Sequence, residues 1–345
     1  MKTILYFGDL SKASNSFYRL KTLERLGYKV KGIDPKEFIP KNKFSFLADK
    51  IHYRTGYVLL QNRMHQKVSK LIDTIDFDLI WVNSGEFFGA KVLQKLKTKG
   101  KKIVLYNNDD PTGGRDGNRF ISLLKGIPYY DVCAVMRDIN VNEYKQLGVK
   151  NVIRVYMSYD EIVHHPFEKT NDIDAKFKSD IVFVGTWMKN EHRDEFLLKL
   201  IEGGLNISIW GGRWEKSPNW NIISKYHKGK HLEGRDYVAA IQGAKICLGM
   251  LSKGNRDLYT SRSVEIPYIG AVFCAERTVT HEKMYIDKEE AVFWSNPEEC
   301  IKICKELLDN KELLESIKEK GREKVKKLKV GNEDVCREIL MAIDN

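Results

Sequence analysis

Short apolar segments alternate with amphipathic ones along the first half of the chain. The short segments fit buried strands, and they span 3–7, 29–33, 79–82, 103–106, 132–136 and 152–156. After the first of them, Phe17, Leu20, Leu23 and Leu26 recur at helical spacing and Gly27 follows as a C-cap. Helical periodicity also marks 59–75, 87–96 and 140–147. Alternating strands and helices predict a doubly wound parallel sheet.

The same alternation restarts after a polar stretch at 168–179. Strands are predicted at 180–184, 207–210, 246–251, 271–275 and 291–294. Helices are predicted at 193–201, 237–244 and 297–308, in the segment between the strands at 246–251 and 271–275, and on to the C-terminus. We therefore expect an α/β protein of two domains, at 1–160 and 180–330, with a linker at 161–179 and a C-terminal helix at 331–345.

Composition agrees with a globular protein, because 42% of the 345 residues are hydrophobic and 30% are charged. No apolar run approaches the length of a membrane helix, and the chain enters the strand at 3–7 without a signal-peptide pattern. The six cysteines include no Cys-x-x-Cys pair, and Cys300 and Cys304 are one helical turn apart, which suits packing better than a disulfide. These features predict a cytoplasmic protein with reduced thiols.

The formal net charge of +11 favours an anionic partner. Nucleic acid is one class, but the lysines are scattered and no nucleic-acid-binding motif is present, so we expect no nucleic acid. A phosphorylated substrate and a peripheral contact with an anionic membrane at its cytoplasmic face fit the charge equally well. Solvated helix faces, as at 95–102 and 324–329, account for much of the excess.

Strand-end loops are the first places to look for a site, since ligands bind at the carboxyl ends of parallel strands. In the second half these loops are 185–187, 211–213 and 253–263. Gly185 and Thr186 would let the backbone approach a diphosphate, and Arg193, Arg213 and Arg262 could neutralise it. An ordinary tight turn for the glycine and a surface charge for Arg193 are the alternatives.

The stretch 254–270 predicts a loop followed by the start of a helix, which is a ready anion site. The predicted binding residues there are Asp257, Tyr259, Thr260, Ser261, Arg262, Ser263 and Glu265. Glu265 falls one turn into the helix, where its carboxylate could accept hydrogen bonds from a sugar or ribose diol. The alternative is that Glu265 is a helix-surface acid and Arg262 its solvated neighbour.

In the first half the most polar strand end is Asn107-Asn108-Asp109-Asp110-Pro111. Asp109 or Asp110 could orient a hydroxyl or act as its base; an Asx turn before Pro111 is the alternative. Asp9, Ser11 and Glu86 follow other strands and are further candidates. The chain has no Gly-x-Gly-x-x-Gly after its first strand, no P-loop and no zinc-ligand spacing, so we expect no cofactor and no metal.

Asp257 and Glu265, with seven residues between them, resemble the acid-x7-acid signature of retaining GT-B glycosyltransferases, with Asp in place of the usual first Glu. The run 262–276 is similar to the CgeB group, and 156–166 resembles the segment that joins the two domains of GT-B enzymes. The resemblance implies two Rossmann-like domains facing across a cleft. It also implies metal-independent sugar transfer from a nucleotide-diphosphate sugar to a hydroxyl of a glycan, lipid-linked or cell-surface saccharide acceptor.

Residue roles follow from the same resemblance. Gly185 and Arg193 would hold the diphosphate, Glu265 the ribose and Asp257 the donor sugar. His164 and His165 could line the cleft, although histidines of a linker are often without function. Two other classes stay open: a nucleotide-sugar epimerase of the same fold, and a non-catalytic protein that binds nucleotide sugars.

Overall fold

The computed structural model describes residues 1–40 and 45–344. The chain divides into two compact units: unit 1 combines Met1–Met157 with Asn332–Asn345, and unit 2 is Ser158–Gly331. The segment 161–179, predicted as a linker, therefore belongs to unit 2, and the C-terminal helix belongs to unit 1.

Unit 1 is built on a six-stranded parallel sheet with the order β2-β1-β3-β4-β5-β6. Its strands are β1 Thr3–Phe7, β2 Lys29–Ile33, β3 Leu79–Asn83, β4 Lys102–Asn107, β5 Val132–Val135 and β6 Asn151–Arg154. All six predicted strands of this half are confirmed, within two residues at each end. Their near-continuous apolar sequence is explained by burial on both faces of the sheet.

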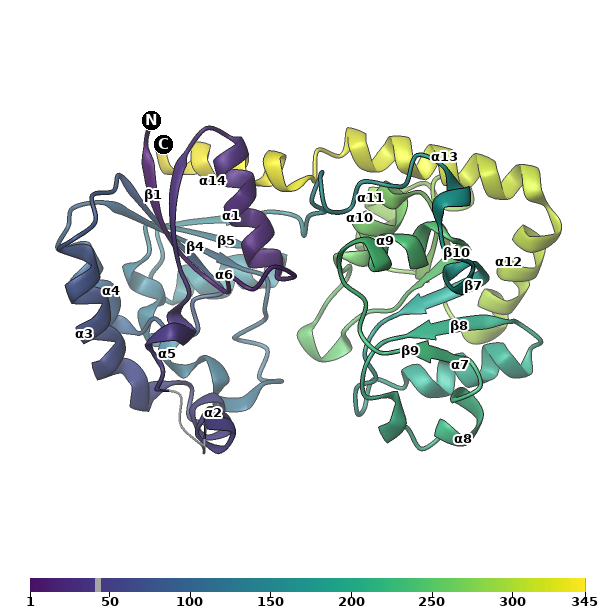
Figure 1. Cartoon of the computed structure of the whole chain (residues 1–345), viewed down its shortest axis with the longest axis horizontal. Helices are drawn as coiled ribbons and strands as arrows, with labels where there is room; N and C mark the ends of the chain where they lie inside the picture. The colour runs from purple at the N-terminus through teal and green to yellow at the C-terminus, as the bar shows by residue number, and fades with distance from the viewer. Residues whose placement is uncertain (41–44, 345) are drawn as a thin grey trace. The chain divides into compact units, whose positions relative to one another are not determined.

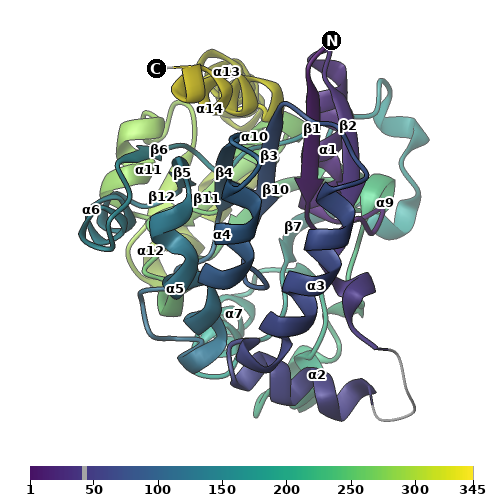
Figure 2. The same cartoon turned by 90° about the vertical axis from the view of Figure 1, so that its left-hand side faces the viewer.

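Helices cover both faces of this sheet. They are α1 Asn15–Arg25, α2 Ser45–Arg54, α3 Gln61–Ile72, α4 Ala90–Lys97, α5 Ile121–Gly126, α6 Asp138–Gln146 and α14 Asn332–Asp344. Figure 2 shows α3, α4 and α5 in front of the sheet, and their apolar side chains share one core with Leu5, Ile80 and Leu105. Short 3-10 segments are η1 Pro35–Phe38, η2 Val58–Leu60, η3 Gly117–Phe120 and η4 Ile127–Tyr129.

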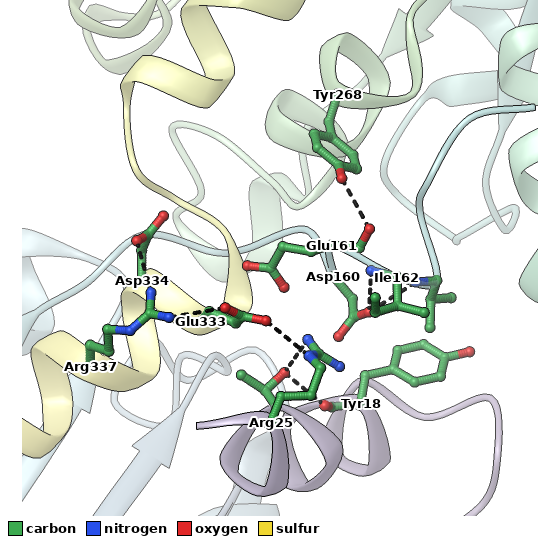
Figure 3. Close-up of polar contacts among 11 residues, drawn as sticks. Tyr18, Arg25, Asp160, Glu161, Ile162, Tyr268, Glu333, Asp334 and Arg337 are labelled. Atoms are coloured by element: carbon green, nitrogen blue, oxygen red, sulfur yellow. Dashed lines mark hydrogen bonds and ion pairs between the residues drawn. The ribbon is translucent and has the colours of Figure 1, made fainter. Parts of the chain in front are cut away.

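The opposite face of the sheet carries α1, and α14 packs beside it. The Tyr6 hydroxyl donates to the Ser16 carbonyl at 2.8 Å, and the Arg19 guanidinium lies 3.4 Å from the centre of the Tyr106 ring. Figure 3 shows the polar link between the two helices: Arg25 Nε donates to Glu333 at 3.0 Å. The last helix of the chain thus completes unit 1.

Unit 2 holds a second six-stranded parallel sheet, with the order β12-β11-β10-β7-β8-β9. The strands are β7 Ser179–Val184, β8 Ile207–Trp210, β9 His227–Gly229, β10 Ala244–Gly249, β11 Val272–Glu276 and β12 Val292–Trp294. The five strands predicted for this half are confirmed, and β9 is an additional one.

The helices of unit 2 are α7 Arg193–Glu202, α8 Trp220–Ile223, α9 Gly234–Gln242, α10 Arg262–Ile269, α11 Val279–Met284, α12 Pro297–Asp309 and α13 Lys311–Lys327, with 3-10 segments η5 Thr170–Asp172, η6 Ala175–Phe177, η7 Trp214–Lys216 and η8 Lys253–Asn255. Side chains of α7, α8 and α12 pack on one face of the sheet. Figure 1 shows α9, α10 and α11 on its other side.

Both sheets have the topological switch point of doubly wound folds. The chain leaves in opposite directions from β1 and β3 in unit 1, and from β7 and β10 in unit 2. Loops that follow such strands diverge and leave a crevice where ligands bind. Among the residues described, every helix is too short or too polar to cross a bilayer.

Candidate functional site

The predicted loops 185–187 and 211–213 follow the neighbouring strands β7 and β8 and lie against each other. The Trp187 N–H donates to the Gly212 carbonyl at 3.0 Å. A Cβ at Gly211, whose φ is +146°, would lie 2.0 Å from the Gly185 carbonyl oxygen. Glycine at 211 therefore permits the close approach of two backbones at this edge of the sheet.

Arg213 and Arg193 have different surroundings. Arg213 is exposed and has a left-handed backbone, with φ +67°. Arg193, at the start of α7, donates from Nη1 to the Thr186 carbonyl at 2.9 Å and from Nη2 to the Leu251 carbonyl at 3.0 Å. Arg193 thus ties the loop after β7 to the end of β10, and its predicted contact with a diphosphate stays a prediction.

Glu265 lies at the centre of a buried polar network, with 2% of its surface exposed. Its carboxylate accepts hydrogen bonds from Arg262 Nη1 and, at 2.5 Å, from the Tyr237 hydroxyl. His164 Nε2 is 4.0 Å from the other carboxylate oxygen. The alternative interpretation of Glu265 as a helix-surface acid is therefore wrong.

This environment determines the protonation of the network. Burial on its own raises the pKa of Glu265, but the charge of Arg262, the nearby His164 and hydrogen bonds from Tyr237 and Arg262 outweigh it and lower the pKa overall. Burial lowers the pKa of His164. His164 Nδ1 accepts the Asp160 N–H at 2.9 Å, so the proton of the neutral ring is on Nε2, the nitrogen nearest Glu265.

Arg262 connects this buried network with the strand-end edge. Its side chain is 32% exposed, stacks over the Tyr237 ring at 4.6 Å, and its Nε lies 3.5 Å from the Val184 carbonyl at the end of β7. The Arg262 guanidinium therefore lies next to the backbone of Val184, the residue before Gly185, and is still partly exposed to solvent. The loops after β7, β8 and β10 and the start of α10 therefore converge on one edge of the sheet.

The loop that leads into α10 is fixed from behind by residues of the β11–α11 region. The Ser263 hydroxyl accepts the Thr260 N–H at 3.1 Å and bonds His281 Nε2 at 2.8 Å. His281 Nδ1 lies 2.7 Å from the Glu276 carbonyl, so Nδ1 carries the proton and Ser263 donates to Nε2. Burial lowers the pKa of His281 to about 4, so this ring is neutral at physiological pH.

Two more contacts hold the same loop. The Thr278 hydroxyl donates to the Leu258 carbonyl at 2.6 Å, and the Glu191 carboxylate accepts the Lys253 N–H at 3.0 Å. Asp257 and Tyr259, between these anchors, are buried, with 7% and 3% of their surface exposed. Sequence reasoning did not identify Tyr237, His281 and Glu191, because each follows an ordinary helical or loop pattern.

In unit 1 the loop after β4 forms the Asx turn, and the catalytic role of Asp109 or Asp110 stays a prediction. The Asp109 N–H donates to Asn107 Oδ1 at 2.7 Å, which confirms the Asx turn. Asp110 is buried and accepts from Asn140 Nδ2 at 2.9 Å. Burial raises the pKa of Asp109, although Arg119 Nη2, at 3.6 Å, opposes this. A carboxylate with a raised pKa is a better proton acceptor.

Arg119 connects Asp109 with a hollow in unit 1. It pairs with Glu86 at 2.7 Å and lies 5.3 Å from the centre of the Tyr53 ring. Tyr53 lines a cavity of about 630 Å³, together with Lys36, Asp49, Tyr57, Phe87 and neighbouring residues. Arg119 was missed from the sequence because it lies twelve residues beyond β4.

Among the residues that the structure describes, three cysteines form a group that could hold a metal ion. The sulfur atoms of Cys274, Cys300 and Cys304 lie within 4.8 Å of one another, and all three residues are buried. Thiolate ligands select soft metals. The six cysteines are free in the structure, and the reduced state stays a prediction.

Comparison with known proteins finds a family model that matches part of the chain and many solved structures of similar fold. Residues 192–331, which include α7 to α13, match the family model described as Glycosyl transferase-like. No curated protein sequence matches the chain.

Solved structures match along the whole length. Sucrose-phosphate synthase from Thermosynechococcus elongatus has a TM-score of 0.70 at 11% identity, covering 99% of this chain and 98% of that one. Anabaena HepE in complex with UDP and glucose has a TM-score of 0.69 at 10% identity, covering 100% of both. A UDP-N-acetylglucosamine 2-epimerase, described as putative, from Listeria monocytogenes has a TM-score of 0.59 at 11% identity, covering 99% and 95%. At such identities the likeness shows the fold.

Proposed function

We propose that this chain, which has the GT-B fold of glycosyltransferases and a glycosyl transferase-like segment at 192–331, moves a sugar from a nucleotide-diphosphate sugar to a hydroxyl acceptor. The observation that carries the proposal is that the matched segment contains Tyr237, Arg262 and Glu265 of the buried network and the loop that precedes α10. The run 262–276 further suggests a CgeB-like enzyme.

The donor belongs to unit 2 in this proposal. Positive charge aimed at the leaving diphosphate stabilises the transition state, and Arg262 and Arg213 would supply that charge at the converging loops. Gly212, where an added Cβ would meet nothing within 4 Å, leaves space beside the backbone for phosphate oxygens. Asp257 would contact the donor sugar.

Glu265 would accept hydrogen bonds from the ribose hydroxyls, and Arg262 would then exchange its partner Glu265 for the diphosphate. In the structure Arg262 bonds Glu265. When a donor binds, the ribose diol can take over hydrogen bonds to the carboxylate while the guanidinium turns to the diphosphate. The buried carboxylate would stay compensated in both states, as a buried charge must be.

The acceptor belongs to unit 1. Asp109 is the better candidate for the base, because its pKa is raised and Asp110 is engaged by Asn140. The hollow beside Tyr53 and Phe87 offers aromatic surface of the kind that packs on sugar rings. A glycan, lipid-linked or cell-surface saccharide acceptor remains the proposed class, and a cytoplasmic location the proposed setting.

A melting-temperature screen against nucleoside diphosphates, with NAD as the control, tests the donor half. A ligand that binds the folded state raises the melting temperature, so UDP or another nucleoside diphosphate should raise it and NAD should not. A shift with NAD alone would contradict the proposal.

The transfer activity should survive the addition of EDTA, because we expect no metal to take part. A complete loss of activity that Mn²⁺ restores would mean that a metal takes part.

A nucleotide-sugar epimerase is the second candidate, because the Listeria protein named above shares the fold. Product analysis separates the two reactions. Transfer releases a nucleoside diphosphate in proportion to glycosylated acceptor, whereas epimerisation yields a new sugar without any acceptor. Donor binding with neither product would identify a binding protein.

A further inference from the structure

Exposed apolar side chains are concentrated in one part of unit 1. Phe46, Leu47 and Ile51 of α2 are 72%, 58% and 45% exposed, and Val58 and Leu59 of η2 are 43% and 66% exposed. We name these five residues the α2–η2 face. Single exposed apolar residues are common on soluble proteins, but a cluster of this size marks an interaction surface.

Helix geometry explains how the α2 part of this face forms. Phe46 and Lys50 are four residues apart, as are Leu47 and Ile51, so these pairs lie on adjacent stripes of the helix. Lys50 Nζ lies 4.3 Å from the centre of the Phe46 ring, which shows the two side chains together. Asp49 and Tyr53 line the hollow of unit 1.

Positive charge is concentrated in the segment 45–70, which contains the α2–η2 face. Residues 45–70 contain five bases, Lys50, Arg54, Arg63, Lys67 and Lys70, and one acid, Asp49, for a net charge of 5 − 1 = +4. All five bases are exposed. These 26 residues of 345 therefore carry more than a third of the chain's net charge of +11.

We infer that the α2–η2 face binds the surface of an anionic lipid bilayer. Apolar side chains of such a face enter the boundary between headgroups and acyl chains, while lysine and arginine bind anionic headgroups. A second copy of this chain is disfavoured as the occupant, because two copies of the segment 45–70, each of net charge +4, repel each other. The apolar side chains distinguish the face from a surface for nucleic acid, where charge and aromatic stacking dominate.

Co-sedimentation with vesicles tests the inference without any substrate, so it succeeds or fails independently of the proposed activity. The full chain is mixed with phosphatidylcholine vesicles, or with vesicles that contain phosphatidylglycerol as well. We expect binding to the anionic vesicles, weakened by salt, and little binding to phosphatidylcholine alone. No binding to the anionic vesicles would overturn the inference.

Paired variants assign the binding to the face. Lys50→Glu with Arg54→Glu should weaken it at least twentyfold, since each base near an anionic surface is worth about fivefold. Leu47→Ser with Leu59→Ser should weaken it about tenfold or more. The matched controls, Lys311→Glu with Lys326→Glu and Val279→Ser with Ile286→Ser, change exposed residues of unit 2 and should have little effect.

Two results would contradict the assignment. Controls that weaken binding as much as the α2–η2 variants would mean that charge or apolarity in general is responsible. A mass that depends on concentration in sedimentation velocity, and that the Leu47→Ser, Leu59→Ser variant abolishes, would mean that the face joins two copies. Unchanged melting temperatures of the variants would establish that each is folded.

Discussion

At the scale of single residues, the centre of the site is the Glu265 carboxylate, which is buried and ionised in the folded protein. Glu265 is buried, yet its pKa is lowered because Arg262, His164 and Tyr237 surround it and overcome the effect of burial. Removing one partner of a buried charge is costlier than removing both. The network is therefore a stability element as well as a candidate binding element.

A double-mutant cycle measures this coupling. Arg262→Met should lower the free energy of unfolding by roughly 1.5–3 kcal/mol, towards the lower value because the arginine is partly exposed. Adding Glu265→Gln should recover part of that loss, since the buried charge is then gone. Urea unfolding of the wild type, both single variants and the double variant gives the coupling. Strictly additive losses would mean that the pair is not coupled.

The neutral His281 makes stability depend on pH. Its pKa is about 4 in the folded protein and about 6.5 when unfolded. The folded state therefore resists protonation, so this contribution is complete above about pH 6.5 and is lost as pH falls towards 4. The loss should reach about 2–4 kcal/mol.

Urea unfolding between pH 7.5 and 4.5 checks this expectation. His281→Gln should be less stable at neutral pH, with a shallower fall in stability on acidification, whereas His231→Gln, at an exposed position, should follow the wild type. An equal slope for His281→Gln and the wild type would show that other groups control the acid sensitivity.

At the scale of elements, strand-end loops position the chemistry, and glycines set how closely they approach. Gly211 and Gly212 offer a matched pair. A Cβ at 211 would overlap the Gly185 carbonyl, and one at 212 would meet nothing within 4 Å.

Gly211→Ala should therefore lower the free energy of unfolding by more than about 2 kcal/mol, from backbone strain and overlap together. Gly212→Ala should stay within about 0.5 kcal/mol of the wild type. Thermal unfolding of the two variants gives the comparison. A Gly211→Ala protein as stable as the wild type would show that the two loops can separate without cost.

The sequence predicted buried strands well because parallel strands covered on both faces are short apolar runs, such as 79–82. It missed β9, His227–Gly229, which is short and polar, and α2, whose apolar residues face solvent instead of a core. It found the candidate loops, since they follow strands. It missed the partners of those loops because Tyr237 lies 28 residues from Glu265, and His281 lies 18 residues from Ser263.

At the scale of the whole molecule, the chain builds unit 2 from one continuous segment and unit 1 from two. Helix α14 buries Val335, Cys336 and Ile339 and pairs with Arg25 of α1 through Glu333. Unit 1 thus depends on residues that follow unit 2 in the sequence.

A chain that ends at Gly331 should therefore lose stability in unit 1 and keep it in unit 2. Each apolar side chain that α14 buries contributes about 1.5–3 kcal/mol, so the loss should be comparable to the whole stability of a small domain, about 5–15 kcal/mol. Hydrogen exchange read by mass spectrometry should show rapid exchange in β1 to β6 and protection in β7, β8 and β10. Equal protection in both units would contradict the assignment of α14 to unit 1.

Because α14 belongs to unit 1 but follows unit 2 in the sequence, unit 2 is complete before unit 1 during synthesis. This is the reverse of the usual order of folding. A ribosome adds about 5–20 residues per second, and most proteins fold their N-terminal domain first. Here the ribosome adds 332 − 157 = 175 residues between Met157, where the first part of unit 1 ends, and Asn332, where α14 begins, which takes roughly 9 to 35 s. During that time unit 1 lacks its last helix, and unit 2 emerges whole. The nascent protein therefore completes its second unit first and exposes the unfinished first sheet to chaperones until α14 has emerged.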